Sequence, residues 1–201
     1  MVHLSWKVLM LTRRDLVGFA SFLAAFGSVR FSNTAEAGLE KPEQTTRFTF
    51  DTLVSIAEKT ALKPYVRPVA VDDHLLSKID YEALGQIRFD TSRALFAKGP
   101  GHYPITFFHL GRFFRTPVKM HVIREGVVQE IIYDKTLFDM PADSPAKALA
   151  PNSGFAGFRF QESRLGDQKK LDWKRNDWLA FLGASYFRAI GEQYQYGISA
   201  R

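Results

Sequence analysis

One segment near the start of the chain carries apolar residues at helical spacing. Within residues 47–65, the apolar positions that fall on one helical face are Phe50, Leu53, Val54, Ala57 and Leu62. Thr49 or Asp51 can cap the start of this helix, and Pro64 ends it. The pattern therefore predicts one amphipathic helix ahead of the remainder of the chain.

Beyond this helix the hydrophobic period shortens to two, which is typical of strands. A short helical turn within residues 77–90 leads into a strand at 86–90. Runs rich in β-branched and aromatic residues follow, and turns containing glycine or proline divide them. These predicted strands lie within residues 102–111, 118–124, 127–134, 154–161, 177–184 and 194–200.

The clearest pair of strands is a hairpin that joins residues 118–124 to 127–134 through a turn at Glu125 and Gly126. Two polar segments, 134–154 and 162–177, are predicted to be surface loops. Several short strands at this spacing indicate a mainly β chain, built as a sandwich or a barrel.

The N-terminus has the pattern of a targeting segment. Arg13 and Arg14 stand just before the apolar run Leu16–Val29, which is too short to cross the ~30 Å hydrocarbon core of a bilayer. Ala35 and Ala37 then form an A-x-A cleavage site. The paired arginines predict a signal peptide for twin-arginine export.

This interpretation divides the chain into a signal peptide, residues 1–37, and a mature domain, residues 38–201. It places the protein in the periplasm, with the twin-arginine translocase as a partner and membrane contact during export alone. The alternative is an amphipathic N-terminal helix of a cytosolic protein. We disfavour it because Leu16–Val29 has almost no polar face.

Composition narrows the possible functions. The chain has no cysteine, which excludes disulfides, thiolate metal sites and a cysteine nucleophile. The formal net charge is +6, but the positive residues are scattered, so no nucleic-acid partner is expected. Hydrophobic residues make up 46% of the chain, which is enough for a sizeable core.

Candidate chemistry is sparse. No histidines stand at metal-ligand spacing, so we expect neither a metal site nor a cofactor. His109 and His121 can face each other across neighbouring strands, although a hydrogen-bonded strand histidine is the favoured interpretation. Asp72 and Asp73 are interpreted as a loop pair whose side chains point apart. Ser185 lacks the G-x-S-x-G elbow of a serine nucleophile.

Trp173 and Trp178 lie among charged residues, an arrangement that suits sugar binding. An aromatic ring can stack on the apolar face of a pyranose while neighbouring polar groups bond its hydroxyls. The favoured alternative is that both indoles fold back onto the sheets.

Longer motifs carry a family resemblance. The segments "FFHLGRFFRTPVKMHVIREGVVQEIIYD", "GFAGFRF" and "FLGASYFRAIGEQYQYGISAR" resemble the osmoregulated periplasmic glucan biosynthesis proteins of the G and D types. "KPYVRP", "IDYEALGQIRFD" and "TSRALFA" fit the same family upstream, so the resemblance covers nearly all of residues 48–201. The twin-arginine signal is closer to the D type. The chain departs from the family at "QESRLG" and at Phe96, where a tryptophan is usual.

The resemblance implies a fold and an activity. It implies that residues 38–201 are the N-terminal part of a large, galactose-mutarotase-like β-sandwich, truncated after Arg201. It also implies binding, and in some members hydrolysis, of β-1,2-linked glucan. An inverting glycosidase needs a carboxylic acid and a carboxylate base. The resemblance places both beyond Arg201, so no catalytic residue is assigned and a catalytically incomplete fragment is expected.

Substrate contact is assigned to the most family-like stretch, where Tyr186, Arg188 and Tyr196 are the candidate glucan-binding residues. Tyrosine offers a flat apolar face with a polar tip, and arginine offers several fixed donors. Two functions remain open: a periplasmic glucan-processing protein, and a non-catalytic carbohydrate-binding or scaffold module. A third possibility, a cytosolic metabolic enzyme, is disfavoured because the signal peptide predicts export.

Overall fold

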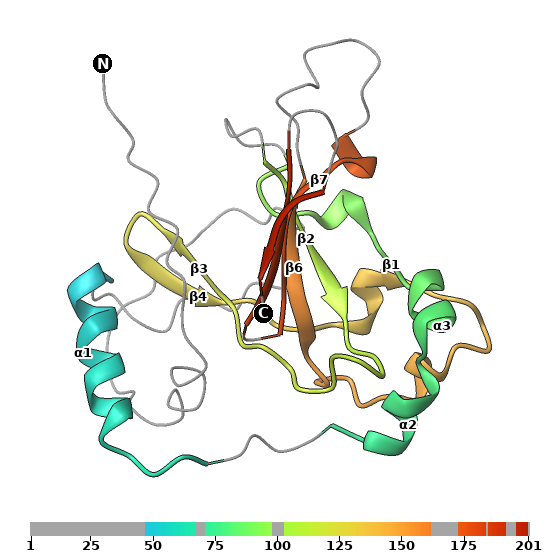
Figure 1. Ribbon diagram of the computed structural model, residues 1–201, viewed down its shortest axis with the longest axis horizontal. Coiled ribbons are helices and arrows are strands. Elements are labelled where there is room, and N and C mark those ends of the chain that lie inside the picture. The colour runs from blue at the N-terminus through green and yellow to red at the C-terminus, as the bar shows by residue number, and fades with distance from the viewer. Residues whose placement is uncertain are drawn as a thin grey trace, which may run out of the picture.

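A five-stranded antiparallel sheet is the centre of the computed structural model, which describes residues 47–66, 71–97, 103–161, 173–183, 185–191 and 196–200. Its strand order is β2-β6-β7-β8-β9 (Figure 1). The bounds are Ile105–His109 for β2, Phe155–Gln161 for β6, Asp177–Leu182 for β7, Tyr186–Ile190 for β8 and Tyr196–Ala200 for β9. Every neighbouring pair in this sheet is antiparallel.

Two smaller sheets and three helices complete the described structure. β1 (Arg88–Phe89) pairs with β5 (Phe138–Asp139), and β3 (His121–Arg124) pairs with β4 (Val127–Glu130). The helices are α1 (Phe50–Ala61), α2 (Asp73–Lys78) and α3 (Tyr81–Gln86). Short 3₁₀ turns lie at Thr91–Arg93, Lys135–Leu137, Pro145–Ala148 and Trp173–Arg175.

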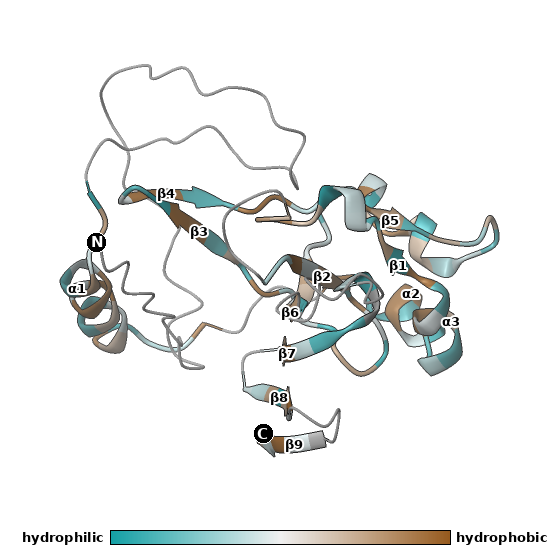
Figure 2. Cartoon of the chain, turned by 90° about the horizontal axis from the view of Figure 1, so that it is seen from above, coloured by the Kyte–Doolittle hydropathy of each residue, from teal (hydrophilic) through white to brown (hydrophobic). Residues whose placement is uncertain are grey.

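The prediction of a mainly β chain with one N-terminal helix is confirmed, and the arrangement fits a β-sandwich. The smaller sheets share an apolar cluster with the large one: Phe89 of β1 lies edge-on to Phe107 of β2, with ring centroids 5.5 Å apart. Val122 of β3 belongs to the same cluster. Figure 2 shows that β8 and β9 form the edge of the large sheet that is farthest from these smaller sheets.

Each helix starts at a capping side chain. Thr49 caps α1 by accepting from the Thr52 backbone N–H at 3.2 Å, as the sequence predicts. Asp80 caps α3 in the same way. The interpretation of Asp72 and Asp73 as a loop pair is wrong, because Asp72 caps α2 and Asp73 is its first residue. Their acidity suits the positive end of the helix dipole.

A second apolar cluster lies where α2 meets the segment that precedes β6. Leu76 of α2 and Ile79, the residue after this helix, pack there with Leu149 and Ala146, all at most 2% exposed. The prediction of a polar surface loop at 134–154 is therefore wrong at Ala146 and Leu149. Leu137 and Phe138 of that segment are likewise buried, in the first cluster.

The predicted hairpin is confirmed, with β3 and β4 joined at Glu125 and Gly126. The predicted strand at 86–90 is confirmed as the two-residue β1, and those at 102–111, 154–161, 177–184 and 194–200 as β2, β6, β7 and β9. β8 is an additional strand that the pattern did not assign.

The proposed targeting segment lies outside the described residues, and with it Arg13, Arg14, Ala35 and Ala37. Most of the predicted loop at 162–177 also lies outside them. Within the part of the chain that the structure describes, no helix has the length and apolar character to cross a membrane.

Candidate functional site

A row of polar side chains crosses one face of the five-stranded sheet. Strand register places Thr106 of β2 opposite Arg159 of β6, and Arg159 opposite Ala180 of β7. Ala180 in turn lies opposite Arg188 of β8, and Arg188 opposite Ser199 of β9. Directly opposed residues share a face of an antiparallel sheet. The row therefore joins residues that are almost a hundred positions apart in sequence.

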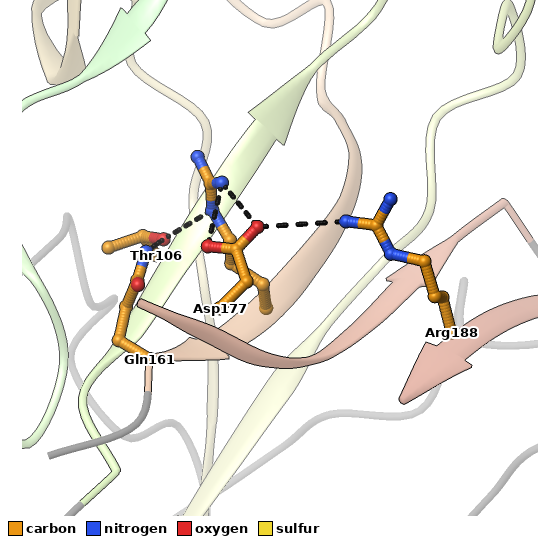
Figure 3. Close-up of polar contacts among 5 residues, drawn as sticks. Thr106, Gln161, Asp177 and Arg188 are labelled. Carbon is orange, nitrogen blue, oxygen red and sulfur yellow. Dashed lines mark hydrogen bonds and ion pairs between the residues drawn. The ribbon is translucent and has the colours of Figure 1, made fainter. Parts of the chain in front are cut away.

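Asp177, the first residue of β7, links the two arginines of this row (Figure 3). Its Oδ1 and Oδ2 accept from Nη1 of Arg159 at 3.0 and 2.9 Å. Its Oδ2 also lies 3.8 Å from Nη2 of Arg188. The residue between the arginines is the small Ala180, which leaves room for the carboxylate above the sheet. One carboxylate thus bridges β6 and β8 across β7.

The guanidinium of Arg159 is held by hydrogen bonds and by an aromatic ring. Its Nε donates to Oγ1 of Thr106 at 3.1 Å, and its Cζ lies 4.7 Å from the ring centroid of Phe108, which is cation–π distance. Together with the Asp177 contacts, these fix the planar group in place. Thr106 is 1% exposed, so this end of the row is built into the sheet.

Gln161 closes the buried end of the cluster. We orient its amide with Nε2 donating to the carbonyls of Trp173 and Asn176, at 3.1 and 2.6 Å, and with Oε1 accepting from Thr106 Oγ1 at 3.2 Å. This orientation pairs every donor with an acceptor, as a residue that is 1% exposed requires. Thr106 then donates to Gln161 while it accepts from Arg159.

The cluster opens toward solvent from β2 to β9. Thr106 is buried, the side chains of Arg159, Asp177 and Arg188 are 28%, 21% and 32% exposed, and Ser199 is exposed. Two guanidinium groups and one carboxylate carry a formal charge of +1. The open end therefore offers hydrogen-bond donors of fixed geometry to acceptor oxygens of a ligand.

The structure brings one of the three predicted glucan-binding residues into this cluster. Arg188 is a member, and Tyr186 lies two residues earlier in β8, hence on the same face and half-buried. The backbone of Tyr196 pairs with Ile190 in β9, and its side chain lies outside the described residues. Their role in binding stays a prediction.

Sequence reasoning missed Thr106, Arg159, Gln161 and Asp177. A signal for Arg159 was present, because it is a charged residue inside the apolar strand "GFAGFRFQ" and needs a partner when half-buried. No local signal marks Asp177 as that partner. Their pairing depends on strand register.

His109 forms a separate, buried polar pair on β2. Its Nδ1 lies 2.7 Å from the Leu110 carbonyl and its Nε2 2.8 Å from the Tyr133 hydroxyl. A carbonyl only accepts, so Nδ1 carries the proton and Nε2 accepts from Tyr133. Burial lowers the pKa of His109 and raises the pKa of Tyr133 to about 12, which keeps both groups neutral.

This geometry confirms the favoured interpretation of His109 as a hydrogen-bonded strand histidine. The alternative, that it faces His121 across neighbouring strands, is wrong because β2 pairs with β6 and β3 pairs with β4. His121 instead lies opposite Glu130, with Nε2 and Oε2 3.9 Å apart. Among the described residues, no group of three or more histidines and carboxylates is arranged to hold a metal ion.

Both tryptophans pack onto the protein, as the favoured interpretation has it. Trp173 is half-buried against the first apolar cluster. Trp178 lies against Tyr103, with ring centroids 4.7 Å apart, and meets the edge of Phe160 at 6.1 Å. Neither indole stands alone as a sugar-stacking platform.

Comparison with known proteins identifies relatives for most of the chain. The model of the family described as "Periplasmic glucan biosynthesis protein, MdoG" matches residues 48–201. The chain is 60% identical over 193 residues to glucans biosynthesis protein D 2 of Ralstonia nicotianae, covering 96% of this chain. It is 38% identical over 196 residues to glucans biosynthesis protein D of Stenotrophomonas maltophilia, covering 94% of this chain.

The alignments cover almost all of this chain but only part of each relative. The chain spans 36% of the length of the Ralstonia relative and 35% of the Stenotrophomonas relative. The glucans biosynthesis protein D of Xylella fastidiosa gives the same picture, with 35% identity over 200 residues and 36% of its length covered.

Proposed function

Since the chain belongs to the MdoG family of periplasmic glucan biosynthesis proteins, we propose that it takes part in periplasmic glucan biosynthesis by contacting a β-1,2-linked glucan. The observation that carries the proposal is the family match over residues 48–201, reinforced by 60% identity to a relative named for glucan biosynthesis. Because the chain spans about a third of that relative, the proposal concerns the complete gene product.

The proposal includes a location and a division of the chain. Residues 1–37 act as a twin-arginine signal peptide, and residues 38–201 are part of the glucan-binding β-sandwich in the periplasm. The family description supports the compartment, and the sequence at Arg13, Arg14, Ala35 and Ala37 supports the route. The twin-arginine translocase is then a partner of the protein, which contacts the membrane during export.

The polar cluster supports binding by the described residues. A glucan presents many hydroxyl and ring oxygens, and the partly exposed side chain of Arg188 carries several donors in one plane. Tyr186, on the same face of β8, adds an aromatic ring that suits the apolar side of a sugar. In the described part of the cluster the one carboxylate, Asp177, is held by arginines, which favours a binding role there over acid–base chemistry.

Calorimetry with a β-1,2-glucan tests this proposal. In the complete gene product, Tyr186→Ala and Arg188→Ala should each weaken binding by about 1–3 kcal/mol. Each substitution removes a hydrogen-bonding group and leaves polar groups of the bound glucan without a partner. The fold should survive, since Asp177 keeps its contacts with Arg159. Matched controls are Tyr81→Ala and Arg88→Ala, which truncate exposed side chains on α3 and β1 and should bind normally.

Unchanged affinity of both β8 variants, with circular dichroism showing an intact fold, would assign these residues to packing instead. Release of reducing ends from the same glucan separates the two open functions. A glucan-processing protein releases them, whereas a non-catalytic carbohydrate-binding or scaffold module binds without release.

A further inference from the structure

We infer that Asp177 is a positioning residue that holds the guanidinium of Arg188 in the orientation used to bind glucan; this inference rests on the proposed function. The observation behind it is the shared carboxylate, which contacts Arg159 at 2.9 Å and Arg188 at 3.8 Å through the same oxygen, Oδ2. Figure 3 shows the ion pair between this carboxylate and Arg188 of β8.

The contacts of Arg159 fix the position of the carboxylate that both arginines share. Arg159 donates to Thr106 and to both oxygens of Asp177, and it stacks on Phe108. Those contacts make Arg159 a fixed support for the carboxylate. Arg188 lies at the longer distance from the carboxylate, nearer the outer strand β9, and its side chain is the most exposed of the three. Arg188 is therefore the member of the cluster that a ligand reaches.

Charge explains why the carboxylate is needed at this place. Arg159 and Arg188 project from β6 and β8 onto the same face, with only Ala180 between them in the row. Without Asp177 these two like charges stand in a half-buried setting with no carboxylate between them, and their repulsion changes the orientation of the Arg188 guanidinium. With Asp177 present, the net charge is +1 and both guanidinium groups are drawn to one point.

Orientation matters for the chemistry of the ligand. A guanidinium group is a planar fork whose donors match pairs of acceptor oxygens only at the correct angle. Glucan hydroxyl groups are neutral, so their recognition depends on this geometry more than on long-range attraction. Fixing the fork before binding lowers the entropy lost on association. Asp177 thus contributes to affinity through Arg188 without itself touching the sugar.

A double-mutant cycle tests this role in the complete gene product. Affinity for a β-1,2-glucan is measured by calorimetry for the wild type, Asp177→Asn, Arg188→Gln and the double variant. Asp177→Asn should weaken binding about two-fold to five-fold, the range for a partly exposed charge contact. In the Arg188→Gln background the same substitution should have no further effect, because the group that it positions is gone.

Asp177→Glu provides a second variant that keeps the negative charge and the pair with Arg159. It lengthens the side chain by one methylene, so it should cause a smaller loss of affinity, again only when Arg188 is present. This variant carries the test if Asp177→Asn fails to fold. Thermal unfolding of each variant reports separately on the structural contact with Arg159, which is expected to matter in both backgrounds.

Three outcomes overturn the inference. Normal affinity of Asp177→Asn shows that Arg188 needs no positioning by the carboxylate. An equal loss in the presence and absence of Arg188 shows that Asp177 acts through the fold as a whole. A wild-type protein that binds no β-1,2-glucan overturns the proposed function as well, and that result is distinguishable because it appears before any substitution is made.

Discussion

Gly157 of β6 lies close against the backbone of β7. A Cβ atom at this position would stand 2.1 Å from the backbone oxygen of Phe181 and 3.0 Å from Cα of Leu182. Both are backbone atoms, which cannot rotate away as a side chain can. A larger residue at this point would therefore push apart two strands that carry the polar cluster, since Arg159 is two residues further along β6 and shares this face.

Gly157→Ala should lower the free energy of unfolding by about 1–3 kcal/mol or more, the usual cost of an overpacked site. Chemical denaturation measures it. The control is Gly85→Ala in α3, where an added Cβ meets nothing within 4 Å. This change should raise stability by about 0.5–1 kcal/mol, because alanine is the better helix former. Similar effects at the two glycines would contradict the assigned crowding.

His109 gives the stability of the protein a pH dependence. The folded protein keeps its buried ring neutral, with a pKa below the ordinary 6.5, whereas the unfolded chain takes up a proton near 6.5. Below that pH the unfolded state binds more protons, so stability falls as the pH is lowered. The contribution of the neutral ring is fully present above pH 6.5 and is lost between 6.5 and the folded pKa.

Unfolding measured between pH 7 and 5 tests this effect. His109→Gln removes the titrating group and should flatten the dependence by up to about 1.4 kcal/mol per pH unit, the slope for one proton. His121→Gln is the comparison, since burial also lowers the pKa of His121 while Glu130 opposes that shift. A pH profile that His109→Gln leaves unchanged would mean that the folded protein protonates this ring normally.

At the scale of elements, the β3–β4 hairpin is closed by two residues in the left-handed region. Glu125 has φ of 53° and Gly126 has φ of 84°. Positive φ at both central residues is the pattern of a type I′ turn, whose twist matches that of the strands. Glycine adopts this conformation without cost, but glutamate does not.

Glu125→Asn should therefore raise the free energy of unfolding by about 0.5–1 kcal/mol, because asparagine tolerates positive φ far better than glutamate. Glu125→Gln is the matched control: it removes the charge, keeps the shape of glutamate, and should have little effect. Denaturation curves of the two variants give the comparison. A gain of similar size in both would attribute the effect to charge and not to turn geometry.

The elements differ in how far sequence alone predicts them. The hairpin, α1 and strands such as β2 and β6 follow from local periodicity and turn residues, and the structure confirms them. The segment 134–154 was missed because its buried residues are isolated within polar sequence, so their burial depends on partners elsewhere. The polar cluster was missed for a related reason. Register brings Asp177 to Arg159 and Arg188, and no local pattern encodes it.

At the scale of the whole molecule, the five-stranded sheet is buried at the edge formed by β2 and exposed to solvent at the edge formed by β9. Phe107 of β2 and Phe155 of β6 pack in the first apolar cluster, and Leu110, which follows β2, packs in the second with Ala156 of β6. The residues of β9 from 197 to 200 are exposed, with Ile198 70% exposed. The proposed glucan contact at Arg188 lies between these two edges, where side chains are held yet reachable.

That contact requires the protein to be in the compartment where the glucan is, which makes the route of export testable. The twin-arginine translocase reads the arginine pair and not its charge alone. The double substitution Arg13→Lys and Arg14→Lys keeps the charge and should block export of a folded reporter fused after Gly38. Arg30→Lys, outside the pair, is the matched control and should be exported normally. Periplasmic and cytoplasmic fractions are compared for each fusion. If the double-lysine fusion reaches the periplasm as efficiently as the original, residues 1–37 do not use the twin-arginine route.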